Sequence, residues 1–139
     1  MKDDSPKPKG ATRYFKTAFG IIPRQKLVEL EAEGVARGLL WVIQQAPKTP
    51  SITAKLLIDL HKHCFGFIFP HWAGTLRRVE VQVSDYTPPA PYTLRQHLVD
   101  FERALSEQLK HIPEKEEERR NHIVRTAAWM QHKIVWIHP

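Results

Sequence analysis

The chain has 139 residues, of which 42% are hydrophobic and 26% charged, and this composition is typical of one globular domain with a core. The net charge of +6 weakly favours an anionic partner, but the basic residues are scattered, so nucleic acid is not the first partner expected. A single cysteine, Cys64, excludes an internal disulfide, and the absence of a long apolar run argues against a membrane span or a signal peptide, so we expect a cytoplasmic protein.

The N-terminal third is predicted to contain a flexible segment and one long helix. Residues 1–23 are poor in periodic apolar positions, and their last part, Ala11–Pro23, is expected to be irregular. A helix is predicted over Arg24–Gln45. Its Gly34 and Gly38 each cost roughly 1 kcal/mol relative to alanine, so we expect another backbone to approach closely there. The buried stripe is expected to be Leu27, Leu30, Gly34, Val35, Leu39, Val42 and Ile43.

The middle of the chain combines a second helix with an aromatic loop. Ser51 is expected to cap a helix over Ile52–Phe65. The following stretch, Gly66–Gly74, is rich in aromatic residues, so we expect it to be packed down rather than solvated. The inner face of the helix is predicted to be Ile52, Leu56, Leu57, Leu60 and Cys64.

A strand is predicted next because apolar and polar residues alternate over Arg78–Val83. Ser84 and Asp85 would form the turn, and the chain would pair back to Thr87 before two prolines end the hairpin. The sequence therefore predicts one β-hairpin, Arg78–Thr87, beside an otherwise helical body.

Two further helices complete the prediction. Thr93 and Gln96 have the spacing of a capping box, which predicts a helix over Leu94–His111. Acidic residues that suit a helix N-terminus open the last helix, Glu114–Ile137. The buried stripe of the helix over Leu94–His111 is expected to be Leu94, Leu98, Phe101, Leu105 and Leu109. That of the last helix is expected to be Ile123, Ala127, Met130, Ile134 and Ile137.

The last helix has a second apolar stripe, made of Trp129, His132 and Trp136. A helix that is apolar on two faces needs cover on both, so we expect it in the centre of the fold. Proline disfavours helix in the residue before it, which places His138 at the helix end, ahead of Pro139. A histidine at the tip of a buried helix is a candidate general base.

The eight histidines do not indicate a metal site. His61 and His63 lie two residues apart, which puts them on different helix faces, and no pair has the spacing of a His-Glu-x-x-His site. The sequence also contains no glycine-rich phosphate loop and no G-x-S-x-G elbow. We therefore expect no metal ligands among these residues.

The order of several short motifs carries more information than any one of them. Leu60-His61-x-x-x-Phe65 is followed by Trp72-Ala73-Gly74, Arg77, the valine-rich hairpin, two prolines and a helix that ends in His138-Pro139. This ordered set, from Arg24 to Pro139, resembles the Fic/Doc family of nucleotidyl transferases, and most closely the compact bacterial Fic proteins of the mobile mystery protein B type. The resemblance implies a mainly α-helical Fic domain over residues 24–139, with one β-hairpin as its flap.

The resemblance also implies an activity and its requirements. In the family, the central helix leads into the motif H-P-F-x-x-G-N-G-R, whose histidine takes a proton from a target hydroxyl that then attacks ATP. His138 matches that histidine. The family's phosphate-binding residues and the acidic residue that holds Mg²⁺ follow the Pro139 position, so this sequence has none of them. We expect a truncated domain that is inactive as given, with ATP and Mg²⁺ implied by the family but not bound by this chain.

Two further roles follow from the resemblance. The hairpin would dock the target protein by strand addition next to His138, through Val79, Val81, Val83 and Tyr86. Glu33, followed by Gly34, resembles the end of the family's inhibitory signature, although Glu29 stands where that signature has serine or threonine. An ordinary surface glutamate explains position 33 equally well.

Two other functions remain open from the sequence. The helices and the hairpin could bind a protein partner without chemistry, or self-associate through apolar surface that the fold leaves exposed. A small basic helical protein could also bind nucleic acid, which salt-dependent binding would reveal.

Overall fold

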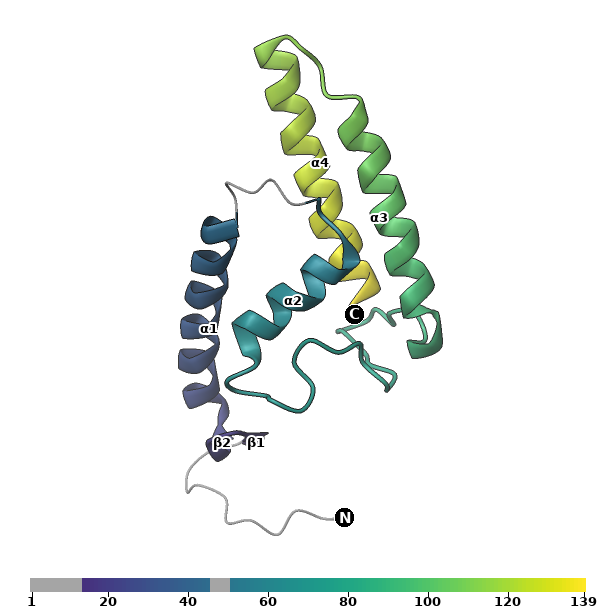
Figure 1. The fold of residues 1–139 in the computed structure, drawn as a ribbon. Helices are drawn as coiled ribbons and strands as arrows, with labels where there is room; N and C mark the ends of the chain where they lie inside the picture. Colours follow the sequence, from purple (N-terminus) through teal and green to yellow (C-terminus); the bar gives the residue numbers. More distant parts are fainter. Residues whose placement is uncertain (1–13, 46–50) are drawn as a thin grey trace. The chain divides into compact units, whose positions relative to one another are not determined.

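The computed structural model describes residues 14–45 and 51–139. These residues form four α-helices and one two-stranded sheet (Figure 1). The elements are β1 (Tyr14–Thr17), β2 (Gly20–Pro23), α1 (Arg24–Gln45), α2 (Ala54–Phe65), α3 (Leu94–Lys110) and α4 (Glu116–Ile137), with a short 3₁₀ turn at Pro91–Thr93. The mainly α-helical fold class is confirmed.

The chain divides into two compact units. The first contains β1, β2, α1 and residues Leu57–Thr75, which include most of α2. The second contains Ser51–Leu56 and Leu76–Pro139, and therefore α3, α4 and the first turn of α2. Each unit is described below by itself.

The sheet of the first unit lies where the sequence predicted irregular structure. β1 and β2 pair antiparallel, from Tyr14 opposite Pro23 to Thr17 opposite Gly20. Gly20 adopts a positive φ of 89°, which glycine tolerates without steric cost, and the Thr17 hydroxyl donates to its carbonyl at 2.9 Å. The irregular lead-in predicted for Ala11–Pro23 is thus wrong from Tyr14 on, because four-residue strands are too short to show a period.

The core of the first unit joins the sheet, the start of α1 and the aromatic loop. The carbonyl of Ile68, a residue with no exposed surface, accepts a hydrogen bond from the Ala18 N–H at 2.8 Å. The prediction that Gly66–Gly74 is packed down is therefore confirmed for Ile68, Phe69 and Ala73, but not for Pro70–Trp72, which are exposed. The buried residues are Ile22, Leu27, Ile68, Phe69 and Ala73.

α1 and α2 meet at the two glycines of α1. A Cβ atom at Gly34 would lie 2.1 Å from the carbonyl oxygen of Cys64, and one at Gly38 would lie 2.1 Å from the Cys64 Sγ. The close approach predicted from the helix-interior glycines is confirmed. The predicted stripe is wrong in its second half, because contact along the glycines turns the neighbouring apolar residues outward. The exposed ones are Val35, Leu39, Val42 and Ile43.

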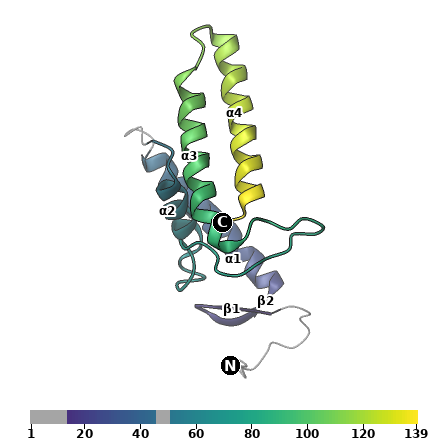
Figure 2. The same cartoon turned by 90° about the vertical axis from the view of Figure 1, so that its right-hand side faces the viewer.

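In the second unit, α3 and α4 lie side by side and antiparallel (Figures 1 and 2). The ring of Phe101 stacks on Trp129 with centroids 5.5 Å apart and an interplanar angle of 9°. The predicted stripe of α3 is buried at Leu94, Leu98, Phe101 and Leu105, while Leu109 is partly exposed. The helical period of this segment therefore identified the packed face, and only its last position fell outside the contact.

The second unit covers one face of α4, whereas the sequence predicted cover on two faces. Only Thr126 and Ile137 are buried on this helix, and Ile123, Val124 and Val135 are more than half exposed. α3 packs against one face of α4 in the second unit, and a single partner helix covers only one side. Within the second unit, the predicted cover is therefore found on one face of α4 only.

The two predicted helix caps also differ. The Thr53 hydroxyl, not Ser51, accepts the Leu56 N–H at 3.1 Å, and the Glu102 carboxylate accepts the Ala54 N–H at 2.8 Å. At α3, the Thr93 hydroxyl donates to the Ala90 carbonyl at 2.7 Å instead of forming a capping box. A 3₁₀ turn runs directly into α3 and already provides that helix with a start.

Candidate functional site

The last turn of α4 delivers His138 as predicted. The helix ends at Ile137, and the His138 N–H donates to the Ile134 carbonyl at 2.9 Å. His138 itself takes a left-handed conformation, with φ 48° and ψ 59°, which costs an L-residue free energy that other contacts must offset. The residue is exposed to solvent, so its imidazole is accessible for chemistry.

Arg77 holds the main chain of this turn. Its Nε donates to the His138 carbonyl at 2.7 Å, and its Nη2 reaches the Ile137 carbonyl at 3.4 Å. Its backbone N–H donates to the Pro139 carbonyl at 2.9 Å. Carbonyls in the last turn of a helix lack intrahelical partners, and α4 has no basic residue there. Arg77 therefore supplies both the missing donors and the positive charge that the helix dipole favours.

Tyr86 makes a second tie to the same helix end. Its hydroxyl donates to the Trp136 carbonyl at 2.6 Å. The Trp136 ring in turn meets the His97 ring of α3 edge-on, with centroids 5.2 Å apart. The predicted target-docking residue Tyr86 is thus brought to the helix end that carries His138.

The predicted hairpin around Tyr86 is reduced to a single pair. Val83 and Tyr86 exchange two main-chain hydrogen bonds of 2.9 Å across a turn in which Ser84 has a φ of 55°. The strand predicted over Arg78–Val83 does not form, because within the described residues no neighbouring strand supplies a ladder for it. Alternating apolar and polar residues make the segment suitable for a strand, but a strand also needs a hydrogen-bonding partner.

The remaining predicted docking residues lie in this unladdered segment. Val79 is 65% exposed and Val83 is 40% exposed, while Val81 is half-buried. Apart from the Val79 carbonyl, which accepts from Arg77 Nη1 at 3.1 Å, no hydrogen bond engages the main chain from 78 to 82 in the part of the chain that the structure describes. Free N–H and C=O groups of this kind can pair with an added strand.

Glu33 lies in the first unit and has a partner on its own helix. Its carboxylate pairs with Arg37 at 2.7 Å, and both side chains are about half exposed. The Arg37 guanidinium also lies over the Phe67 ring, 3.9 Å from its centroid. This geometry is that of an ordinary i, i+4 pair, and the inhibitory role of Glu33 stays a prediction.

His61 of α2 binds the main chain of the aromatic loop, a structural role that was not predicted from the sequence. His61 Nδ1 accepts the N–H of Gly74 at 3.0 Å, and its ring packs against Phe65 at 5.1 Å between centroids. Burial lowers the pKa of His61, which favours the neutral ring that this hydrogen bond needs. The spacing between His61 and Trp72-Ala73-Gly74 was the signal in the sequence.

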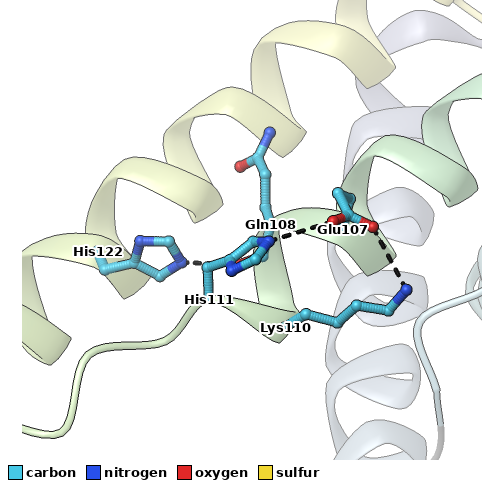
Figure 3. Close-up of polar contacts among 5 residues, drawn as sticks. All are labelled: Glu107, Gln108, Lys110, His111 and His122. Carbon is cyan, nitrogen blue, oxygen red and sulfur yellow. Dashed lines mark hydrogen bonds and ion pairs between the residues drawn. The ribbon is translucent and has the colours of Figure 1, made fainter.

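The opposite end of the α3–α4 pair carries only local polar contacts (Figure 3). Hydrogen bonds from His111 and Lys110 hold the pKa of the exposed Glu107 below its usual value. His122 Nε2 donates to the Gln108 carbonyl at 2.9 Å and so satisfies the C-terminal end of α3. These contacts complete helix ends and pair surface charges, and they form no reactive cluster.

The groups around His138 do not fit magnesium. They are main-chain carbonyls already bonded to a guanidinium, and no carboxylate is bonded among them. Among the described residues, no three His, Cys, Asp or Glu side chains are grouped to hold a metal ion.

Comparison with known proteins gives a consistent result. The sequence profile of the Fic/DOC family matches residues 51–139. A curated relative, "Protein adenylyltransferase Fic" of Nematostella vectensis, is 36% identical over 92 residues, which are 66% of this chain and 20% of the relative. The protein of the same name from Drosophila persimilis is 34% identical over 88 residues, 63% of this chain and 16% of the relative. The chain thus spans about a fifth of the length of such relatives.

The fold has a counterpart among solved structures. The N-terminal Fic domain of a Bartonella effector protein (Bep) superposes with a TM-score of 0.64 over 95% of this chain and 62% of that one, at 19% sequence identity. No helix in the described residues combines the length and apolarity needed to cross a bilayer.

Proposed function

This chain belongs to the Fic/DOC family, and we propose that it is the N-terminal portion of a protein adenylyltransferase domain whose general base is His138. The observation that carries the proposal is the end of α4. There the main chain of His138 is anchored by Arg77 while the residue itself stays exposed. A base needs a fixed position and an accessible ring, and this arrangement supports both.

The chemistry assigned to this chain is proton removal at a target hydroxyl. His138 would accept the hydroxyl proton as the oxygen attacks the α-phosphorus of ATP, and pyrophosphate would leave. General-base help of this kind contributes about 10²–10⁴-fold. Phosphoryl transfer depends chiefly on positioning and charge stabilisation, for which the residues around His138 offer one guanidinium already bonded to carbonyls.

The target is proposed to dock along residues 78–83. The exposed side chains of Val79 and Val83 support this, as do the main-chain groups of residues 78–82, which are unpaired apart from the Val79 carbonyl. An extended peptide could add to them as a strand. A target peptide added to this segment would then lie next to the Val83–Tyr86 turn, which is bonded to α4 through the Tyr86 hydroxyl. The target is therefore a flexible protein segment that carries a hydroxyl side chain.

The decisive experiment follows labelled AMP. The polypeptide of these 139 residues, mixed with ATP, magnesium and a candidate target, is expected to transfer no detectable AMP, because it has a base but no phosphate-binding loop. Appending a Fic-type continuation that starts Phe-x-x-Gly-Asn-Gly-Arg after Pro139 should produce transfer. His138→Ala in the extended chain should abolish it.

Two results would contradict the proposal. One is AMP transfer by the 139 residues alone, and the other is transfer by the extended chain that does not depend on His138. Binding of the target should survive His138→Ala in both chains, which separates docking from chemistry.

A binding module without chemistry is the second candidate function. The exposed apolar residues Ile123, Val124 and Val135 on α4 favour it, because such a surface suits a protein partner or a second copy of the chain. Target binding by the extended chain without any AMP transfer would support this candidate over the first.

A further inference from the structure

One side chain connects the start of the proposed docking segment, and the chain that follows the Val83–Tyr86 turn, to the turn that carries the base. The Arg77 guanidinium donates to the carbonyl of Val79, at the start of the segment, and to that of Pro89, beyond its end. The same group donates to the carbonyls of His138 and Ile137. A single planar cation therefore bonds to three stretches of main chain.

Arginine is suited to this task by its geometry. Its five donors lie in a rigid fork, whereas a lysine offers a compact point charge on a flexible stem. The Arg77 contacts given above are all to carbonyl oxygens and none is to a carboxylate, so helix and loop dipoles balance its charge. Charge-assisted hydrogen bonds of this type are about twice as strong as neutral ones.

The conformation of His138 explains why such a tie is needed. The left-handed backbone at φ 48° is unfavourable for a residue with a Cβ atom, and the residue is exposed, so packing of its own side chain does not hold it in place. The hydrogen bonds to its carbonyl and to the carbonyls on either side, from the Arg77 side chain and backbone N–H, act directly on that backbone.

We propose that Arg77 is a positioning residue. It fixes the docking segment and the backbone of His138 relative to one another, so that the hydroxyl of a docked target lies next to the imidazole. This inference rests on the proposed function, since it assigns a role to the same site. Arg77 touches neither nucleotide nor target in this role and acts only through the main chain of its partners.

Amide hydrogen exchange on the labelled 139-residue chain tests the tie without any activity. Arg77→Met, which keeps most of the aliphatic stem, should speed exchange of the His138 N–H by about tenfold or more, because it removes several charge-assisted bonds. Arg77→Lys should give a smaller increase. The exposed neighbour Arg78 provides the matched control, and Arg78→Met should leave the exchange rate of the His138 N–H unchanged. Amides of Leu98 and Leu105 in α3 report whether the unit stays folded.

Two exchange results would overturn the proposal. In one, His138 exchange is unchanged in Arg77→Met while α3 remains protected. In the other, Arg77→Met and Arg77→Lys both lose protection throughout α3, which would make Arg77 a residue of general stability.

Kinetics of the extended chain add a readout that general stability would not move. Arg77→Met should lower kcat by about 10²-fold, as expected for misplacement of a base, and leave KM for ATP unchanged. Arg77→Lys should recover part of kcat. A KM change with unchanged kcat would contradict the proposal. If the extended wild-type chain transfers no AMP, the proposed function fails, and the exchange data alone then decide whether the tie exists.

Discussion

Two histidines in this chain are held in opposite ways. His61 is held by its ring, which is half-buried, accepts the Gly74 N–H and packs on Phe65. His138 is held by its main chain, which Arg77 and the last turn of α4 fix, while the residue remains exposed. Both belong to the ordered motifs of the sequence, yet only the second keeps its ring accessible.

The difference is consistent with different roles for the two regions. A ring nitrogen that accepts a buried N–H is committed to structure, because releasing it would leave the donor without a partner. A histidine fixed through its carbonyl keeps both ring nitrogens for other partners. The region around His61 is therefore a folding element, and the region around His138 is a candidate for chemistry.

The largest expected effect comes from breaking the helix contact that supports the His61 region. Gly34→Ala should destabilise the protein by about 1–3 kcal/mol or more, since its Cβ would strike the Cys64 backbone carbonyl. Gly38→Ala should cost less, because its Cβ would meet the Cys64 side chain, which can shift more easily than a backbone carbonyl. Urea unfolding measures both free energies.

Cys64→Ala sharpens this test. It removes the sulfur that a Cβ at Gly38 would meet, so it should relieve Gly38→Ala and leave Gly34→Ala as harmful as before. Equal rescue of both glycine variants would show that the backbone contact is not the cause.

A smaller effect is expected at His61 itself. His61→Ala should cost about 1 kcal/mol at pH 7, because the Gly74 N–H loses its acceptor. Burial lowers the pKa of His61 in the folded state, so the unfolded chain binds the proton first and stability falls as the pH drops below the ordinary value of about 6.5. His61→Ala should remove this part of the pH dependence.

The control is His63, which is exposed and stacks on Trp41 at 4.4 Å between centroids. His63→Ala should leave the fall between pH 7 and pH 5 in place. Unfolding free energies across that range measure both variants, and a wild-type slope in His61→Ala would argue against the assignment.

The smallest effect, and one of opposite sign, is expected at His138. Glycine avoids the left-handed penalty of roughly 1–2 kcal/mol but loses about 0.5–1 kcal/mol more chain entropy on folding. His138→Gly should therefore raise stability by at most about 1.5 kcal/mol, seen as a slightly higher Tm, while it removes the proposed base. A clear loss of stability would mean that the ring has structural contacts and that the two histidines are more alike than the structure shows.

The sequence by itself determined the helices and the place of the candidate base. Helical periodicity and breakers located all four helices, with α1 matched at both ends and α2, α3 and α4 within a few residues. Pro139 placed His138 at the end of α4, and the glycine pair in α1 predicted a close approach that the structure confirms at Cys64. These features depend on residues within a few turns of one another, so local pattern specifies them.

Tertiary structure decided which groups hold these elements in place. Arg77 and Tyr86 reach α4 across 50 to 61 residues of sequence, and Glu102 caps α2 across 48. Residues 78–83 have the pattern of a strand but form only the Val83–Tyr86 bridge, whereas β1 and β2, between Tyr14 and Pro23, pair with each other. A period in the sequence shows which face of a segment is apolar, but not which distant segment will supply its hydrogen bonds. Those partners are chosen by packing, because a donor or acceptor is satisfied by whatever group the fold brings within about 3 Å.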